Sequence, residues 1–123
     1  MGKALMEGEG VMDAVINLRR EPALREELAH TPVHNNTVLI DRRTKWGNRF
    51  RIGRDGTRWE VITRYRADLW SRIRAGDITL EELAEMDGKR LACWCDPQPC
   101  HGHVLARAAA WAASALAERR GES

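Results

Sequence analysis

Two short apolar segments, each followed by a polar stretch, constrain the fold of this chain most. Residues 37–41 (TVLID) and residues 89–95 (KRLACWC) both predict buried strands, and helical patterns lie between and after them. This order predicts an α/β domain with a small, mostly parallel sheet flanked by helices in a Rossmann-like arrangement. Because ligands bind beyond the carboxyl ends of the strands in such sheets, the two polar stretches are candidates for one shared crevice.

Capping signals and hydrophobic spacing indicate the helices of the core. Thr57 with Glu60, and Thr79 with Glu82, have the spacing of capping boxes, so each pair is expected to open a helix. A third, alanine-rich helix is expected from Cys100 to Arg119. The first two helices lie between the strands and supply the crossover that a parallel pair requires.

The N-terminal part of the chain has a helical pattern of its own. From Val11 to Leu28 apolar residues recur every three to four positions, and Pro22 interrupts the series. We therefore expect a helical N-terminal extension over residues 1–36 and an α/β core over residues 37–119. With 123 residues, the chain has room for one core of ordinary size and not for two.

Composition and the lengths of the apolar runs exclude several classes of protein. Hydrophobic residues make up 43% of the chain, which is enough to bury a core, so general disorder is not expected. No apolar run approaches the roughly 20 residues of a membrane helix, and residues 1–10 lack the pattern of a signal peptide. The sequence therefore predicts a soluble, cytoplasmic protein with no membrane partner, and it leaves the oligomeric state open.

The formal net charge of +2 hides an uneven distribution of charge. Residues 42–74 contain 11 Lys and Arg against 3 acidic residues, a net charge of +8, while residues 1–41 and 75–123 each carry −3. A basic middle between acidic flanks fits a patch that binds an anion such as phosphate. It fits a solvated helix face equally well, and the sequence leaves both interpretations open.

The stretch of residues 42–56 (RRTKWGNRFRIGRDG) is long for a plain connection, which favours a functional loop. Its glycines permit a close backbone approach to a ligand, its aromatic side chains offer stacking faces, and its cations offer phosphate contacts. The candidate binding residues are Lys45, Trp46, Gly47, Asn48, Arg49, Arg51, Gly53 and Arg54. Alternatively, Trp46 and Phe50 fold back as core residues, and residues 50–52 are a candidate edge strand. The Walker A and G-x-G-x-x-G motifs of standard nucleotide sites are absent from the sequence.

All three cysteines lie within residues 93–103 (CWCDPQPCHGH), where an odd number of thiols in an intracellular protein argues against a disulfide. One interpretation is a zinc or iron–sulfur site, although the spacing is not that of the usual C-x-x-C pairs. Its candidate ligands are Cys93, Cys95, Cys100, His101 and His103. A second interpretation is a catalytic Cys100 with His101, at a helix N-terminus that stabilises a thiolate or binds phosphate. A third is that the thiols are ordinary buried side chains, which is the favoured interpretation for Cys93.

The segments TKWGNRFRIGRDGTRWEVITRYR and KRLACWCDPQPCHGHVLA together resemble an uncharacterised family of bacterial and phage proteins, catalogued as domain of unknown function 4326. The family pattern is a strand, a K-W-G-N-P-F-x-I-G-x-D-G-T-R-x-E-V-I block, and later L-x-C-W-C-x-P-x-P-C-H-G-D-x-L. The resemblance covers residues 37–110 and carries no established activity. It implies one site made of Lys45, Trp46, Gly47, Asn48, Gly53, Arg58 and Glu60 with Cys93, Cys95, Cys100 and His101.

Two residues depart from the family pattern. Arg49 stands where the pattern has Pro, which makes the loop less rigid and more basic. His103 stands where the pattern has Asp, so any role of that carboxylate as an acid or as a partner of His101 is altered here.

The sequence supports three functional hypotheses. The leading one is a small enzyme acting on a nucleotide or nucleic acid, with the arginines of the loop on phosphate, Trp46 stacking, and Cys100 with His101 at the reacting centre. The first alternative is a non-catalytic nucleic-acid-binding or regulatory module whose affinity comes from the basic middle. The second is a structural domain stabilised by zinc or an iron–sulfur cluster.

Overall fold

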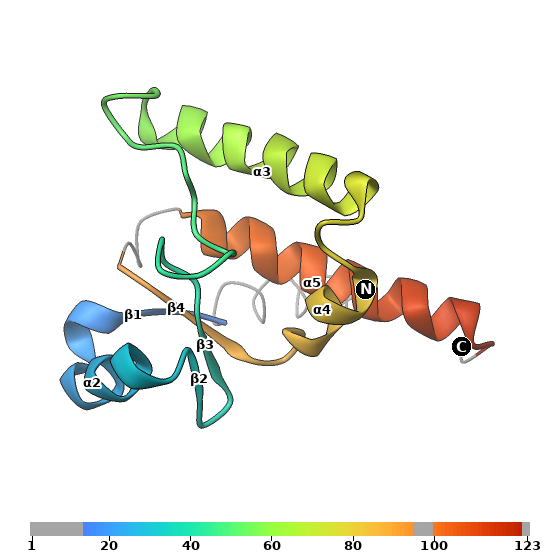
Figure 1. The fold of residues 1–123 in the computed structure, drawn as a ribbon, viewed down its shortest axis with the longest axis horizontal. Coiled ribbons are helices and arrows are strands. Elements are labelled where there is room, and N and C mark those ends of the chain that lie inside the picture. Colours follow the sequence, from blue (N-terminus) through green and yellow to red (C-terminus); the bar gives the residue numbers. More distant parts are fainter. Residues whose placement is uncertain (1–13, 95–99, 122–123) are drawn as a thin grey trace, which may run out of the picture.

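The computed structural model describes residues 14–94 and 100–121, and its centre is a mixed sheet of four strands. The strands lie in the order β1-β4-β3-β2 (Figure 1). Their bounds are Val15–Asn17 (β1), Val33–His34 (β2), Thr37–Leu39 (β3) and Arg90–Cys93 (β4). Strand β4 pairs in parallel with both β1 and β3, whereas β2 pairs antiparallel with β3. The chain is thus an α/β protein, and the antiparallel β2 makes its sheet mixed.

Helices cover both faces of this sheet. The bounds of the helices are Leu18–Arg20 (η1, a 3-10 turn), Pro22–His30 (α2), Arg58–Ala75 (α3), Leu80–Glu85 (α4) and His101–Arg119 (α5). Helices α3, α4 and α5 lie on one side of the sheet and α2 on the other (Figure 1). Alternation along the strands supplies both cores, since Leu91 and Cys93 of β4 face the α5 side and Ala92 faces the α2 side.

The capping signals in the sequence correctly located the helices of the core. Thr57 and Glu60 form a complete capping box at the start of α3, and Thr79 and Glu82 form another at the start of α4. Cys100 is the N-cap of α5, which ends at Arg119 as expected. In the described parts of the chain, no helix is long and apolar enough to cross a bilayer.

The expected N-terminal helix is wrong before Pro22, over the residues that the structure describes, whereas its second part after Pro22 is confirmed as α2. Val15 to Asn17 form strand β1, which extends the sheet beyond β4. Val15 packs with the α5 side of the sheet and Leu18 with the α2 side, so the two residues that seemed to share a helix face lie on opposite faces of the sheet. A three-residue strand that runs into a 3-10 turn can mimic a helical period.

Two further strand predictions differ from the structure. Residues 50–52, all within the described part of the chain, form no strand. Conversely, strand β2 was not predicted. The signal in the sequence was the pair Asn35 and Asn36, which forms the two-residue turn between β2 and β3 with positive φ values of 47° and 60°. Asparagine tolerates this left-handed backbone, which matches the twist of a tight hairpin.

Candidate functional site

The two polar stretches that the sequence singled out meet at one edge of the sheet. Strands β3 and β4 are parallel neighbours, with Leu39 opposite Ala92, so the segments that leave their carboxyl ends emerge side by side. A hydrogen bond joins them directly, because Nε2 of His101, in the first turn of α5, lies 2.6 Å from the backbone oxygen of Ile40. The two stretches therefore lie next to each other, as the sequence predicted.

A small cavity of about 140 Å³ lies at this junction and is called the inner cavity here. The loop after β3, the start of α3 and the Cys–His segment, defined as residues 93–94 and 100–103, all contribute to its lining. The lining includes Asp41, Arg42, Asn48, Phe50, Arg58, Cys93, Trp94, Cys100 and His101. Most of the exposed lining is apolar, and the cavity is large enough for one small chemical group.

Cys93 and Cys100 are in contact at the wall of the inner cavity. Their Sγ atoms are 3.2 Å apart, and their side chains are 1% and 3% exposed. Both are thiols that are not joined in a disulfide. Cys100 has an extended backbone at the N-cap of α5, and its sulfur accepts the N–H of Gly102 at 3.3 Å. The positive end of a 19-residue helix therefore lies at this sulfur, which favours a thiolate there.

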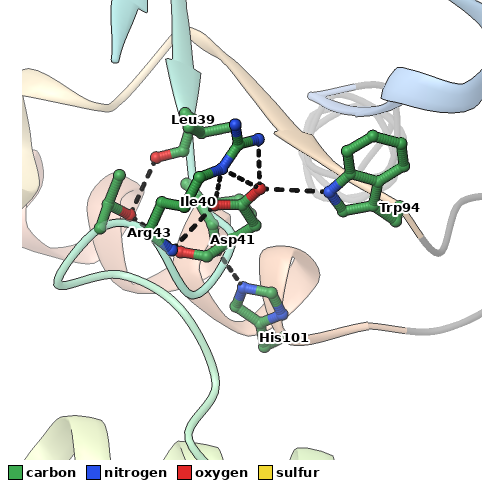
Figure 2. A network of polar contacts seen from close by, with 7 residues as sticks. Leu39, Ile40, Asp41, Arg43, Trp94 and His101 are labelled. Carbon is green, nitrogen blue, oxygen red and sulfur yellow. Dashed lines mark hydrogen bonds and ion pairs between the residues drawn. The ribbon is translucent and has the colours of Figure 1, made fainter. Parts of the chain in front are cut away.

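His101 is held in a fixed orientation beneath the loop (Figure 2). Because a carbonyl oxygen can only accept, Nε2 of His101 must carry a proton and donate it to Ile40. In the neutral imidazole this leaves Nδ1 as the basic nitrogen. The ring also packs edge-on against Tyr65, with 4.9 Å between the ring centroids. These contacts give His101 a positioning role between β3 and α5.

Tyr65 connects the same site to the loop from the opposite side. Its hydroxyl donates a hydrogen bond of 2.9 Å to the backbone oxygen of Trp46. Burial raises the pKa of the Tyr65 hydroxyl well above its usual value of 10.0, so the group stays protonated and remains a donor. Trp46 itself is partly buried and packs against the core on the α5 side, with Nζ of Lys45 over its ring.

Asp41 anchors a polar network at the carboxyl end of β3 (Figure 2). Its carboxylate pairs with the guanidinium of Arg43 at 2.6 Å and accepts the indole N–H of Trp94 at 3.1 Å. Partial burial raises the pKa of this carboxyl, but the hydrogen bonds from Arg43 and Trp94 outweigh it, so the net pKa lies below the usual 3.8. The network joins the loop after β3 to the residue that follows β4.

The backbone of the loop is fixed by Asn48, Arg42 and Gly47. The buried Asn48 amide donates to the backbone oxygen of Val61 in α3 and accepts from the backbone N–H of Phe50. The Arg42 guanidinium donates to the backbone oxygen of Asn48 at 2.9 Å. A Cβ at Gly47 would lie 2.5 Å from the backbone oxygen of Asp41, so the loop passes β3 at a distance that only glycine permits.

A second, more open hollow of about 400 Å³ lies beside the inner cavity and is called the basic pocket here. Its lining includes six cationic side chains and one carboxylate, and Arg42 belongs to both hollows. The cations are Arg42, Lys45, Arg49, Arg51, Arg54 and Arg72, and the carboxylate is Asp68. The predicted phosphate residues Lys45, Arg49, Arg51 and Arg54 thus surround one space, together with Gly47.

Most cations of the basic pocket have acidic or carbonyl partners nearby. Arg49 pairs with Asp68, Arg54 with Asp55 and Lys45 with Glu82, and the hydrogen bond from Lys45 lowers the pKa of Glu82. Arg51 forms no ion pair with any residue that the structure describes. These partners hold the exposed side chains around the hollow, but at an exposed surface such pairs are weak and exchange readily for a ligand.

Of the remaining predicted residues, one lines the inner cavity and two have structural positions. Arg58 lines the inner cavity at the start of α3. Glu60 accepts the backbone N–H of Thr57 in the capping box, and this hydrogen bond lowers its pKa. Gly53 has a φ of 93° in a turn of the loop. The structure therefore brings Arg58 to the site and uses Glu60 and Gly53 to shape the loop.

The structure describes four of the five candidate metal ligands, and Cys95 lies outside the described residues. Among those described, no group of three or more His, Cys, Asp or Glu side chains is arranged to hold a metal ion. Nδ1 of His103 accepts the backbone N–H of Cys100 at 3.3 Å and so caps α5. His103 thus performs at the third helical position the capping task that an acidic residue commonly has.

Several residues that line the inner cavity were not predicted as site residues from the sequence. Asp41, Arg42, Phe50 and Trp94 all line the inner cavity. Each lies within or next to a segment that was selected, because Asp41 ends the first predicted strand and Trp94 stands between two of the cysteines. A polar residue directly after a buried strand was the available signal for Asp41 and Arg42.

Comparison with known proteins gives a family and no activity. The family described as "Domain of unknown function (DUF4326)" matches residues 24–111. An uncharacterised 12.4 kDa protein of the nrdA-td intergenic region of Enterobacteria phage T4 is 43% identical to this chain over 70 residues. That alignment covers 56% of this chain and 63% of the phage protein, so the chain spans less than two thirds of that relative. No solved structure matches the chain.

Proposed function

This chain belongs to that family of unknown function, and from this premise we propose that it is a small enzyme acting on a nucleotide or nucleic acid. The phosphate would bind in the basic pocket, and the group to be modified would enter the inner cavity, where Cys100 is the reacting side chain. The observation that carries the proposal is that Arg42 lines both hollows, so a ligand with one anionic and one apolar part could occupy both.

The charge of the basic pocket supports phosphate as the anionic part of the ligand. Six cations around one carboxylate leave a net charge of +5 in the lining, and the like charges repel one another until an anion binds. Arginine, which supplies five of the six cations, matches the geometry of a phosphate with two parallel N–H donors. Arg51 is the best candidate for the first contact. Arg42 and Arg72 also lack ion pairs but donate side-chain hydrogen bonds to backbone oxygens, whereas the Arg51 side chain makes neither kind of contact with any described residue.

The lining of the inner cavity supports a ring or sugar as the second part of the ligand. Phe50 lines this cavity, whereas Trp46 packs on the core, so Phe50 is the better candidate for an apolar contact. The cavity lies beyond the carboxyl ends of the parallel strands β3 and β4. Rossmann-like sheets bind their ligands at this position.

The environment of Cys100 supports its role as the reacting group. The Gly102 N–H and the helix N-terminus stabilise negative charge on its sulfur. His101 holds the start of α5 against β3 and fixes the position of the sulfur relative to the cavity. A thiolate held at a cavity wall by a fixed scaffold is the arrangement that nucleophilic catalysis requires.

Calorimetric titration with adenosine triphosphate, adenosine and a single-stranded oligonucleotide tests the binding step. We expect the phosphate-bearing probes to bind and adenosine to bind far more weakly, with affinity falling as salt is raised. Arg51→Ala should weaken binding about tenfold, the effect of one lost charge-assisted contact. Arg107→Ala, which removes an exposed cation from α5 outside both hollows, is the matched control and should change nothing. Absence of binding by every phosphate probe at low ionic strength would refute the proposal.

The enzymatic step is tested with Cys100→Ser. Serine is a good N-cap, so this variant should keep α5 and the binding of phosphate probes. Once a substrate is identified among the bound probes, turnover should fall at least 100-fold, because a hydroxyl is a far weaker nucleophile than a thiolate. Full turnover by the variant would remove Cys100 from the reaction.

A non-catalytic nucleic-acid-binding module is the second candidate, and the exposed Trp59 favours it. Trp59 is 66% exposed at the start of α3 and lines a shallow hollow together with Arg64. An exposed indole beside a cation is typical of surfaces that stack single-stranded bases. If this candidate holds, Trp59→Ala should weaken oligonucleotide binding while Trp111→Ala, which alters an exposed indole on α5, should not.

A further inference from the structure

The contact between Cys93 and Cys100 is a feature that nucleophilic attack by Cys100 alone does not require. The two residues come from different elements, the end of β4 and the N-cap of α5, yet their sulfurs are 3.2 Å apart. Both side chains are almost completely buried and both line the inner cavity. A reagent small enough to enter the inner cavity would therefore approach both of these residues.

The surrounding structure holds both sulfurs in place. Cys93 lies in β4 opposite Asn17 of β1, so its backbone is fixed by the sheet. The sulfur of Cys100 is fixed by the Gly102 N–H, and a Cβ at Gly102 would lie 3.3 Å from it and 2.9 Å from Ile40. Disulfide formation needs the sulfurs to approach from 3.2 Å to about 2.05 Å, a movement of about an ångström that side-chain rotation can supply.

We propose that Cys93 and Cys100 form a reversible disulfide that switches the inner cavity between an active dithiol state and an inactive oxidised state. The inference rests on the proposed function in one respect, namely that Cys100 is the reacting group. The oxidant would be a small disulfide such as oxidised glutathione. This assignment revises the expectation from the sequence that no disulfide forms.

The exchange proceeds in two balanced steps. The Cys100 thiolate attacks one sulfur of the small disulfide and expels a thiolate, which takes up the proton that Cys100 has lost. The Cys93 thiol then loses its proton, and its thiolate attacks Sγ of Cys100 in the mixed disulfide. The second small thiolate leaves and takes up the proton that Cys93 has lost. Two electrons pass from the protein dithiol to the small disulfide, which leaves as two thiols, and excess small thiol reverses both steps.

Oxidation would change the site in two ways. The disulfide consumes the Cys100 thiolate, so the cavity loses its nucleophile while the basic pocket keeps its charge. It also links Cys93 to Cys100, seven positions apart in the sequence, which constrains the unfolded chain. We therefore expect the oxidised protein to be chemically inert at Cys100, to bind phosphate probes still, and to unfold at higher denaturant concentration than the reduced protein.

Equilibration of the folded protein in buffers of reduced and oxidised glutathione tests the pair, with peptide mapping to locate the disulfide. Wild type and Cys95→Ser should both form the Cys93–Cys100 disulfide and lose alkylation of Cys100 by iodoacetamide at the same buffer ratio. Cys93→Ser and Cys100→Ser should form no intramolecular disulfide at that ratio. A disulfide that maps to Cys95, or thiols that stay reduced when oxidised glutathione is in excess, would overturn the proposal.

The effect on the reaction is separable from disulfide formation. Cys93→Ser keeps Cys100 but lacks its partner, so its reaction with iodoacetamide should persist after treatment with oxidised glutathione and removal of any mixed disulfide by a brief thiol wash. Wild type washed in the same way should remain protected. If the disulfide forms and no phosphate probe binds, the dithiol pair stands and the nucleotide function fails. If phosphate probes bind and no disulfide forms, the nucleotide function stands and the dithiol pair fails.

Discussion

The inner cavity and the basic pocket share Arg42 but differ in how their side chains are held. Around the inner cavity, buried groups such as Asn48 and His101 make hydrogen bonds to backbone atoms of neighbouring elements. Around the basic pocket, long exposed side chains are held by surface ion pairs, as Arg49 is by Asp68. Buried polar groups are costly to disturb, whereas surface pairs contribute little to stability. The inner cavity is therefore held more rigidly than the basic pocket, and under the proposed function the first would fix geometry while the second would supply affinity.

The largest effect on the fixed geometry of the inner cavity is expected when the loop is forced away from β3. Gly47→Ala places a methyl group 2.5 Å from the backbone oxygen of Asp41, and the loop must shift to relieve the overlap. We expect a loss of about 3 kcal/mol in the free energy of unfolding, measured by urea denaturation. Binding of phosphate probes should fall as well, because Arg42 and the cations after it move with the loop.

Gly53→Ala is the control for this change. Its φ of 93° strains any other residue, but no atom lies within 4 Å of the added carbon. The cost should be about 1 kcal/mol, with the inner cavity intact. Equal costs at the two glycines would show that the close approach of the loop to β3 is unimportant.

Substitutions at two neighbouring residues of the loop allow the contributions of the two hollows to stability to be compared directly. Asn48→Ala removes the hydrogen bond to Val61 and the acceptor for the backbone N–H of Phe50 in a buried setting, so we expect a loss of about 2 kcal/mol. Arg49→Ala removes an ion pair whose arginine side chain is 71% exposed, so we expect less than about 0.5 kcal/mol. Urea denaturation measures both stabilities, and calorimetry with adenosine triphosphate should show that Arg49→Ala nevertheless weakens binding. A larger stability loss in Arg49→Ala would reverse the comparison.

The pH dependence of stability tests the Asp41 network between the two hollows. The pKa of Asp41 is lowered in the folded protein, so its contribution is complete above the usual value of 3.8 and is lost as the pH falls through the lower, folded-state value. Relative to Asp41→Asn, wild type should therefore be more stable at neutral pH by about 1 kcal/mol and should lose this advantage in acid. Because the other carboxyl groups titrate in both proteins, the difference between the two urea midpoints isolates Asp41. A difference that does not change with pH would exclude the ionised carboxylate as the stabilising group.

The sequence predicted the parts of this fold that depend on local signals. The capping boxes at Thr57 and Thr79 need only residues three positions apart, and both are present in the structure. The meeting of the loop with the Cys–His segment followed from a general rule about parallel strands. Strand β1 was missed because its three residues are defined by pairing with β4, more than 70 positions away along the chain.

The sequence located the segments that line the two hollows, but it could not decide how individual side chains in them are packed. Charge and spacing placed Arg51 and Cys100 in the site, but burial decides that Trp46 packs on the core. The contact between Cys93 and Cys100 depends on the distance between β4 and the start of α5, which no local pattern encodes. Cys95 lies outside the described residues, so zinc or iron bound by the cysteines stays a prediction for metal analysis of the purified protein.

A small effect is expected at His103, which occupies the position of an aspartate in the family pattern. Its Nδ1 accepts the backbone N–H of Cys100, a task that a protonated imidazole cannot perform because both of its nitrogens then donate. His103→Asp would place a negatively charged acceptor in the first turn of α5. We expect the variant to be about 0.5 kcal/mol more stable than wild type at neutral pH, by urea denaturation.

His103→Ala is the matched control, since it removes the cap without adding charge and should be less stable than both wild type and His103→Asp. The same three proteins connect stability to the chemistry of Cys100. A carboxylate in the first turn of α5 opposes a thiolate at its N-cap by charge repulsion, so iodoacetamide should react more slowly with Cys100 in the aspartate variant than in wild type. Faster alkylation in that variant would show that His103 does not influence Cys100 through charge.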